Sequence, residues 1–283
     1  MLGLGNDLVS DGVQSVWATR FASFNGTSSK ALVSPGALVS TLKGGGDIGD
    51  NVSFSMWIKA TWTIPASPTN SAIDFIPFWY LGSNTDVHES MRMFYSIESG
   101  STNKNDVNID LRSTAPSNVR QNDTMRLHDG DNAAQTGSAG SSHVQMWDSD
   151  NTNITTNNEG FVHLVVTRGT GDWKIYWNGV VAASIIDNDS GSLNQDDSEY
   201  DSFSVGYWEY ADSYALMGIR DYAVYASELS AGNVRLLYNE GKFDDHRGLI
   251  TPQPVAYYPL ESDGVDVISG VDFSLTNVTF SEL

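Results

Sequence analysis

The sequence of 283 residues contains no cysteine, so disulfide bonds cannot contribute to its stability. Basic residues are also scarce, because 15 Lys and Arg stand against 35 Asp and Glu and the formal net charge is −20. The few basic residues do not cluster along the chain. This charge balance argues against nucleic acid and against an anionic membrane surface as partners.

Long apolar runs are missing as well. No run approaches the roughly 20 residues that a membrane-spanning helix needs. The first 17 residues lack the basic start and the continuous apolar stretch of a secretory signal. We therefore expect a protein that stays where it is made or that leaves the cell by lysis or particle assembly. The length suffices for one large β domain or two smaller ones.

The sequence also lacks recognisable catalytic motifs. The sequence has no Gly-x-Ser-x-Gly motif and no phosphate-binding glycine loop. Its five histidines show neither His-x-His nor His-x-x-x-His spacing. Ser40-Thr41-Leu42-Lys43 matches Ser-x-x-Lys, but no helix is expected after it and the companion motifs are lacking. We expect that the protein is not an enzyme.

Alternating apolar and polar residues predict a series of short β-strands. In residues 51–61, every second residue from Val52 to Ala60 is apolar, with Trp57 on the opposite face, which predicts a half-buried strand. Further strands are expected at residues 74–81, 92–98, 107–112, 161–167, 173–177, 180–186, 202–207 and 215–225.

Asn178-Gly179 is a strong signal for a type I′ turn between two of these strands. Trp173, Ile175 and Trp177 share one face of the strand before the turn. Large aromatic side chains fill cores more often than they bind ligands. We therefore expect these three residues in the core and not in a binding site.

A single helix is predicted, at residues 231–241. Ser230 is placed to cap it, Val234 and Leu237 lie on one face, and Gly241 ends it. About a dozen short strands separated by turn residues, with one short helix, predict an all-β antiparallel sandwich.

Residues 115–160 interrupt the regular series of strands. They are polar and rich in Asn, Asp, Ser, Thr and Gly. We expect loops around one or two short strands, at 124–128 and 143–148. Loops on a rigid sandwich often carry binding, and a solvated crossover without a partner is the alternative.

Several motifs occur in an order that resembles the laminin-G-like domains. They are Phe24-Asn25-Gly26, SFSMWIKA at 53–60, HLVVTRGTGDWKIYWNG at 163–179, SVG at 204–206 and GIRDYAVYASELSAGNVRLLYNEG at 218–241. The resemblance covers residues 22–241 and rests on the order and spacing of the motifs. It implies the concanavalin-A-like jelly roll, with two antiparallel sheets and Greek-key connections.

The usual first strand of that family has its counterpart at the opposite end, in PVAYYPLESDGVDVISGVDFSLTNVTF at 254–280. Either this segment completes the sheet, or a truncated second copy begins at Val255. Roughly 30 residues cannot form a sandwich alone, which favours completion. We expect one domain at residues 21–283, with 250–283 completing the sheet. Residues 1–20 are expected to be an arm that docks on a neighbouring subunit, or one more edge strand.

The same superfamily includes laminarinase-type glycoside hydrolases, which carry Glu-x-Asp-x-x-Glu on one strand. That spacing places nucleophile and acid on the same side. Here only Glu261-Ser262-Asp263-Gly264-Val265-Asp266 approaches the motif, in a turn-like stretch. We interpret this match as a coincidence. A glycosidase function therefore lacks the pair of catalytic carboxylates that it needs.

Acidic residues gather in the loop at 187–199. Clustered carboxylates suit Ca²⁺, a hard cation, although the spacing is not that of an EF-hand. The candidate metal ligands are Asp187, Asp189, Asp196, Asp197 and Glu199. A structural calcium ion and a solvated acidic loop are the two alternatives.

Glycan binding would need an exposed aromatic ring beside Asn or Asp acceptors. The candidates are Trp208, Tyr210, Tyr214, Trp147 and Trp62. Ordinary packing between strand ends is the alternative for each of them.

Two classes of function follow from the resemblance. The first is a non-catalytic virion structural protein, a capsid decoration or a tail- or fibre-associated lectin-like subunit, as laminin-G-like domains in bacteriophage virions are. Its partners would be other virion proteins, further copies of itself and glycans. The second is a secreted, extracellular, calcium-dependent carbohydrate-binding or adhesion module. The lack of a recognisable signal, linker repeat or attached catalytic domain favours the virion.

Overall fold

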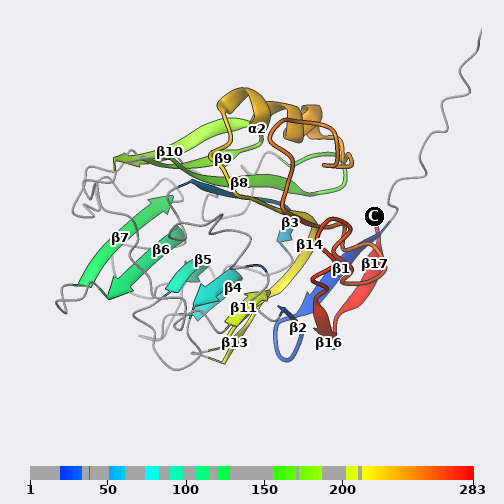
Figure 1. The fold of residues 1–283 in the computed structure, drawn as a ribbon. Helices are drawn as coiled ribbons and strands as arrows, with labels where there is room; N and C mark the ends of the chain where they lie inside the picture. The colour runs from blue at the N-terminus through cyan, green and yellow to red at the C-terminus, as the bar shows by residue number, and fades with distance from the viewer. Residues whose placement is uncertain are drawn as a thin grey trace, which may run out of the picture.

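A computed structural model describes residues 20–33, 38, 51–60, 74–82, 90–97, 106–114, 120–127, 156–169, 172–186, 202–209 and 212–283. These residues form two large antiparallel sheets that pack against each other as a sandwich (Figure 1). The prediction of an all-β antiparallel sandwich with one short helix is therefore confirmed.

The first sheet has eight strands. They are β1 (Arg20–Asn25), β3 (Val52–Ala60), β8 (Val162–Gly169), β9 (Asp172–Trp177), β10 (Val180–Ile186), β14 (Leu216–Tyr225), β15 (Ala256–Tyr258) and β17 (Thr279–Glu282). Their order is β10-β9-β8-β3-β14-β1-β17, and β15 also pairs with β14. Strands β8, β9 and β10 follow one another along the chain, whereas β3, β14, β1 and β17 come from distant parts of it, as Greek-key connections require.

The second sheet has the order β16-β2-β11-β4-β5-β6-β7. Its strands are β2 (Lys30–Val33), β4 (Asp74–Gly82), β5 (Ser90–Ile97), β6 (Asp106–Thr114), β7 (Arg120–Leu127), β11 (Ser202–Val205) and β16 (Ser274–Thr276). A separate short ladder joins β12 (Tyr207–Trp208) to β13 (Ser213–Tyr214). Strand β7 contains most of the segment predicted at 124–128, whereas 143–148 lies outside the described residues.

The turn between β9 and β10 has the predicted type. Asn178 and Gly179 both have positive φ, at 49° and 80°, as a type I′ turn requires. Of the residues expected to share the core face, Ile175 is fully buried and Trp177 packs half-buried against the core. The side chain of Trp173 lies outside the described part.

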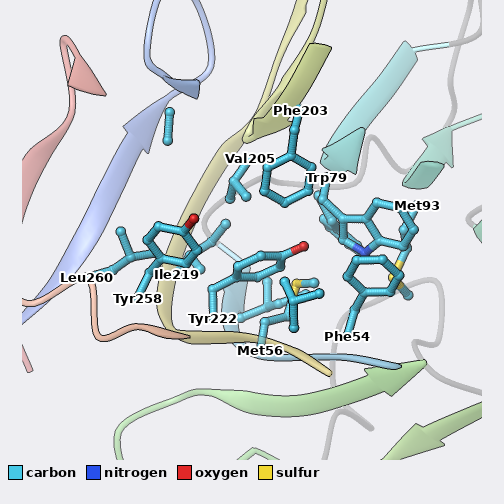
Figure 2. Close-up of a cluster of buried hydrophobic side chains, with 14 of the residues drawn as sticks. Phe54, Met56, Trp79, Met93, Phe203, Val205, Ile219, Tyr222, Tyr258 and Leu260 are labelled. Atoms are coloured by element: carbon cyan, nitrogen blue, oxygen red, sulfur yellow. The ribbon is translucent and has the colours of Figure 1, made fainter. Parts of the chain in front are cut away.

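The main core lies between the two sheets and is rich in aromatic rings (Figure 2). Phe54 of β3 stacks on Trp79 of β4 with ring centres 4.2 Å apart, which joins one sheet to the other. At the other end of the core, Tyr258 of β15 lies 4.0 Å from Phe273. Offset aromatic pairs of this kind add to the stability that burial alone provides.

Strand β3 departs from the expectation of a half-buried strand. Its apolar face enters the main core as predicted, but Ser53, Ser55 and Trp57 on the other face are also fully buried. The expected exposure of that face is wrong because a layer of chain covers it. Trp57 lies 5.9 Å from Tyr238 and 5.0 Å from Phe243, ring centre to ring centre.

This covering layer begins with helix α2 (Ala231–Tyr238) and continues through the 3-10 turn η2 (Asn239–Gly241) to residue 250. Ser230 caps the helix as predicted, because its hydroxyl accepts a hydrogen bond from the Asn233 amide. The helix ends earlier than expected, at Tyr238, where Asn239 adopts the left-handed conformation that ends many helices. In Figure 1, α2 lies over β8, β9 and β10.

The C-terminal segment adds strands to both sheets. β15 pairs with β14, β17 pairs with β1, and β16 pairs with β2. Strands β1 and β15 lie one after the other along the same edge of β14, because β1 pairs with residues 216–219 and β15 with residues 222–224. The segment therefore occupies sheet positions that β1 leaves vacant along β14.

A buried ion pair marks the point on β14 where β1 gives way to β15. Arg220 Nε donates to Asp221 Oδ2 at 2.8 Å, and the two side chains are 2% and 1% exposed. The pairing register with β3 shifts here, and Asp221 has a φ of 51°. Tyr257 donates its hydroxyl to Asp221 at 2.7 Å, and Glu261 accepts from Arg220 at 3.2 Å. The Arg220 guanidinium also lies 3.9 Å from the ring centre of Phe243.

A chain without residues 250–283 should not fold stably, and should therefore show no cooperative unfolding transition. The deletion removes fully buried Tyr258 and Leu260, and truncating one large buried side chain costs about 3–5 kcal/mol. Whole domains are stable by only about 5–15 kcal/mol. Urea melts followed by tryptophan fluorescence would measure this. Ile268→Ala, at an exposed position of the same segment, should shift stability by less than about 0.5 kcal/mol. A truncated chain that melts like the full one would contradict the prediction.

Two histidines are buried where the covering layer meets the first sheet. His163 on β8 is fully buried and shares a 3.0 Å hydrogen bond between its Nε2 and the Ser55 hydroxyl. His246 stacks on Tyr257 at 5.0 Å and contacts the Tyr225 hydroxyl at 3.3 Å. Burial lowers the pKa of both imidazoles. Asp221, Asp245 and Asp244 oppose the shift at His246, and Arg220 adds to it.

Stability should fall as the pH drops below about 6.5, the ordinary pKa of histidine. Burial lowers the pKa of both imidazoles in the folded protein, so the unfolded chain binds more protons as the pH falls through this range. Each histidine then lowers the unfolding free energy by up to about 1.4 kcal/mol per pH unit. Urea melts at pH 7.5, 6.0 and 5.0 would show this, and His163→Gln with His246→Gln should flatten the profile. Equal stability at pH 7.5 and 5.0 would refute it.

Candidate functional site

The candidate site is the short β12–β13 hairpin between β11 and β14. Its ladder pairs Tyr207 with Tyr214 and Trp208 with Ser213. The hairpin starts at Gly206, whose amide donates to Phe78 O at 3.0 Å and whose carbonyl accepts from Ala215 at 2.9 Å. These bonds fix the base of the hairpin to the sandwich.

Gly206 is required at this base for two reasons. Its φ is 71°, which side-chain-bearing residues rarely adopt, and an added Cβ would lie 2.3 Å from the ring of Phe24. The base of the hairpin therefore packs closely against Phe24 of the core.

The sequence-predicted glycan residues that the structure describes differ in exposure. The ring of Trp208 is buried, with 6% exposure, and lies 6.5 Å from the Tyr80 ring. Tyr214 is only half-buried. Of the two, Tyr214 is the one with a ring surface available to a ligand, and Trp208 supports the hairpin from beneath.

Asp212 organises the tyrosines of the hairpin. Its Oδ1 accepts from the Tyr214 hydroxyl at 2.8 Å and from the Tyr207 hydroxyl at 3.2 Å. The hydrogen bond to Asp212 raises the pKa of Tyr214, and burial raises that of Tyr207. The two tyrosine rings lie 4.8 Å apart, and Lys30 Nζ lies 4.7 Å from the centre of the Tyr207 ring. Both phenols therefore stay protonated at neutral pH and act as hydrogen-bond donors to the carboxylate.

The arrangement can bind a polar ring-shaped ligand. Tyr214 offers an aromatic face, Asp212 a carboxylate acceptor and Lys30 an ammonium donor, with Tyr207 holding them together. Sequence reasoning missed Tyr207, Asp212 and Lys30. The spacing of Tyr207 and Tyr214 around a polar turn was the signal for the first two, whereas Lys30 comes from β2 and left no local signal.

Several predicted site residues lie outside the described part of the chain. These are Tyr210, Trp147 and Trp62 among the glycan candidates, and Asp187, Asp189, Asp196, Asp197 and Glu199 among the calcium candidates. They stay predictions. Among the residues that the structure describes, no group of three or more His, Asp or Glu side chains could hold a metal ion.

The carboxylates of the Glu261–Asp266 stretch bind the chain itself. Glu261 accepts from Arg220, Asp263 from the Val265 amide at 3.1 Å, and Asp266 from the Tyr257 amide at 2.9 Å. Burial raises the pKa of Glu261. The three side chains hold a turn and an ion pair, which gives this near-match to a glycosidase motif a structural explanation.

No protein-family profile matches the sequence, and no curated protein matches it either. Solved structures do match. A Bacteroides ovatus protein proposed to bind carbohydrate aligns over 94% of this chain with a TM-score of 0.52 and 13% identity. This chain spans 60% of the length of that protein. The chain has the concanavalin-A-like jelly-roll fold.

Two further structures share the sandwich more distantly. A heptameric SAP-like pentraxin from Limulus polyphemus covers 93% of this chain and 94% of its own, at a TM-score of 0.48 and 10% identity. The CBM40 of a Ruminococcus gnavus IT-sialidase, bound to α2,6 sialyllactose, aligns with 77% of this chain and 97% of its own length. Its TM-score is 0.45 and its sequence identity is 10%. Within the described residues, no helix of this chain is long and apolar enough to cross a membrane.

Proposed function

We propose that this protein is a non-catalytic, lectin-like protein that binds glycans through the β12–β13 hairpin, and that it serves as a structural protein of a virion. The half-buried Tyr214 ring held beside Asp212 is the observation that carries the first part. A sugar presents a weakly polar ring face and several hydroxyls, which an aromatic face and a carboxylate recognise together.

The hydrogen bonds within the hairpin and at its base support this proposal. Asp212 holds both tyrosine hydroxyls, and Gly206 fixes the hairpin base to the core. A site ordered before binding loses less conformational entropy when the ligand arrives. The jelly-roll fold shared with the Bacteroides ovatus protein is compatible with glycan binding, but fold alone does not determine function.

The virion role is supported by the sequence. The motif order over residues 22–241 resembles laminin-G-like domains of bacteriophage virions. The structure adds a sandwich in which the carboxylates nearest to a hydrolase motif bind the chain's own backbone and Arg220. A secreted, calcium-dependent carbohydrate-binding module is the alternative, and it would require an ion in the 187–199 loop.

Glycan binding should depend on the hairpin. Tyr214→Ala and Asp212→Ala are each expected to weaken binding about tenfold, because each removes a contact of about 1–2 kcal/mol. A glycan array followed by calorimetry on the best ligand would measure this, with Trp147→Ala and Trp62→Ala testing the other loops. Val180→Ala, at a position 65% exposed on another hairpin, serves as the matched control. Unchanged binding by both hairpin variants would contradict the assignment.

The chain should be present in purified particles if it is a virion protein. Mass spectrometry of gradient-purified virions from the source is expected to detect it at the copy number of a capsid or tail subunit. Its absence from virions, with recovery from the culture supernatant instead, would favour the secreted module. Melting with calcium and with chelator separates the two classes further, since a bound ion raises the melting temperature.

A further inference from the structure

A cavity of about 480 Å³ lies on the outer side of the first sheet, where the 156–160 turn meets residues 238–243. Its size is within the range of small-molecule sites. The cavity is remote from the hairpin, because it adjoins the end of α2, and α2 and β13 lie at opposite ends of the molecule in Figure 1.

Asn157 locks the two walls of this cavity together. Its side-chain nitrogen Nδ2 donates to Gly241 O at 3.0 Å, which joins the 156–160 turn to the 238–243 segment. Its Oδ1 accepts from the Phe161 amide at 2.8 Å and from the Glu159 amide at 3.1 Å. The cavity is therefore shaped by fixed backbone and does not depend on a chance gap between loose loops.

Aromatic side chains form the apolar part of the lining. Tyr238 and Phe243 both contribute to the cavity wall. Each is held from behind by Trp57, and Phe161 packs edge-on against Phe243 at 5.3 Å. These contacts place two rings in fixed positions beside a polar rim.

The charged side chains of the rim have no partner among the described residues. Glu159, Glu240 and Lys242 line the cavity, and none of their side-chain atoms takes part in a hydrogen bond or ion pair with another described residue. Two carboxylates can accept from hydroxyls and one ammonium can donate to them. The excess of carboxylate, in a chain of net charge −20, disfavours anionic ligands.

The backbone conformation of Glu240 is one that a glutamate adopts only at a cost in stability. Glu240 has φ 55° and ψ 30°, between Asn239 at φ 43° and Gly241 at φ 88°. Glycine adopts this left-handed region without a steric penalty, whereas glutamate does not. Glu240 is exposed and lines the cavity, so its carboxylate is available to a ligand despite the unfavourable backbone.

We propose that this cavity is a second ligand site, independent of the hairpin, that takes an uncharged sugar ring. The ring stacks on Tyr238 and Phe243, and its hydroxyls donate to Glu159 and Glu240 and accept from Lys242. A site of this kind on the outer face would let one chain hold two glycan segments at once, which increases avidity without tightening either site.

Saturation-transfer NMR with the methyl glycosides of glucose, galactose and N-acetylglucosamine tests the proposal, with sialic acid as the anionic probe. At least one neutral glycoside should show transfer in the wild type and in Tyr214→Ala, and sialic acid should show none in Tyr214→Ala. Glu240→Gly should weaken that binding at least about tenfold. The same variant should keep or raise the melting temperature, because glycine fits the left-handed backbone.

Asn277→Gly is the matched control, since Asn277 is exposed and has a φ of 51° away from the cavity. It relieves the same kind of backbone strain and should leave binding unchanged. Absence of transfer from every neutral glycoside, or equal binding by Glu240→Gly and wild type, would overturn the proposal. Loss of all neutral binding in Tyr214→Ala would overturn it too, while supporting the hairpin as the site.

Discussion

The buried pair of Arg220 and Asp221 is the constraint on which the rest of the fold depends. Two charges that are almost inaccessible to water cost several kcal/mol each unless their geometry and hydrogen bonds compensate. Here the compensation comes from residues far along the chain, namely the Tyr257 hydroxyl, the Glu261 carboxylate and the Phe243 ring. Strand β14 can therefore adopt its bulge only when the C-terminal segment and the covering layer are in place.

The same bulge explains the arrangement of the sheet. On one side of it β14 pairs with β1, and on the other side with β15, while β3 pairs along the opposite edge of β14. Because the covering layer must approach β14 to place Phe243 over Arg220, it also covers the outer face of β3 and buries Trp57 and His163. One polar requirement thus determines which strands are buried on both faces.

The sequence was sufficient for the features that depend on local pattern. Alternation located the longer strands but not β1, β2, β16 or β17, Asn178-Gly179 identified the turn, and Ser230 marked the start of the helix. The sequence did not predict features that arise where segments distant along the chain meet. The outer face of β3 has the polar alternation of an exposed strand, and its burial depends on residues that lie 174 or more positions further along the chain. Likewise, Asp212 became recognisable as a site residue only when β13 brought Tyr214 opposite Tyr207.

Among the described residues, the left-handed conformation occurs at structural positions, Asp221 included, and also beside both candidate ligand surfaces. Asn178 and Asn239 adopt that conformation at a turn and a helix end, where asparagine is a usual choice for folding. Asp212 and Glu240 adopt it beside the two surfaces that can hold a ligand, and there glycine would satisfy the backbone better. Asp212 recovers part of this cost by accepting two tyrosine hydroxyls. Glu240 is exposed and has no such partner among the described residues, so its carboxylate is available to a ligand in the cavity.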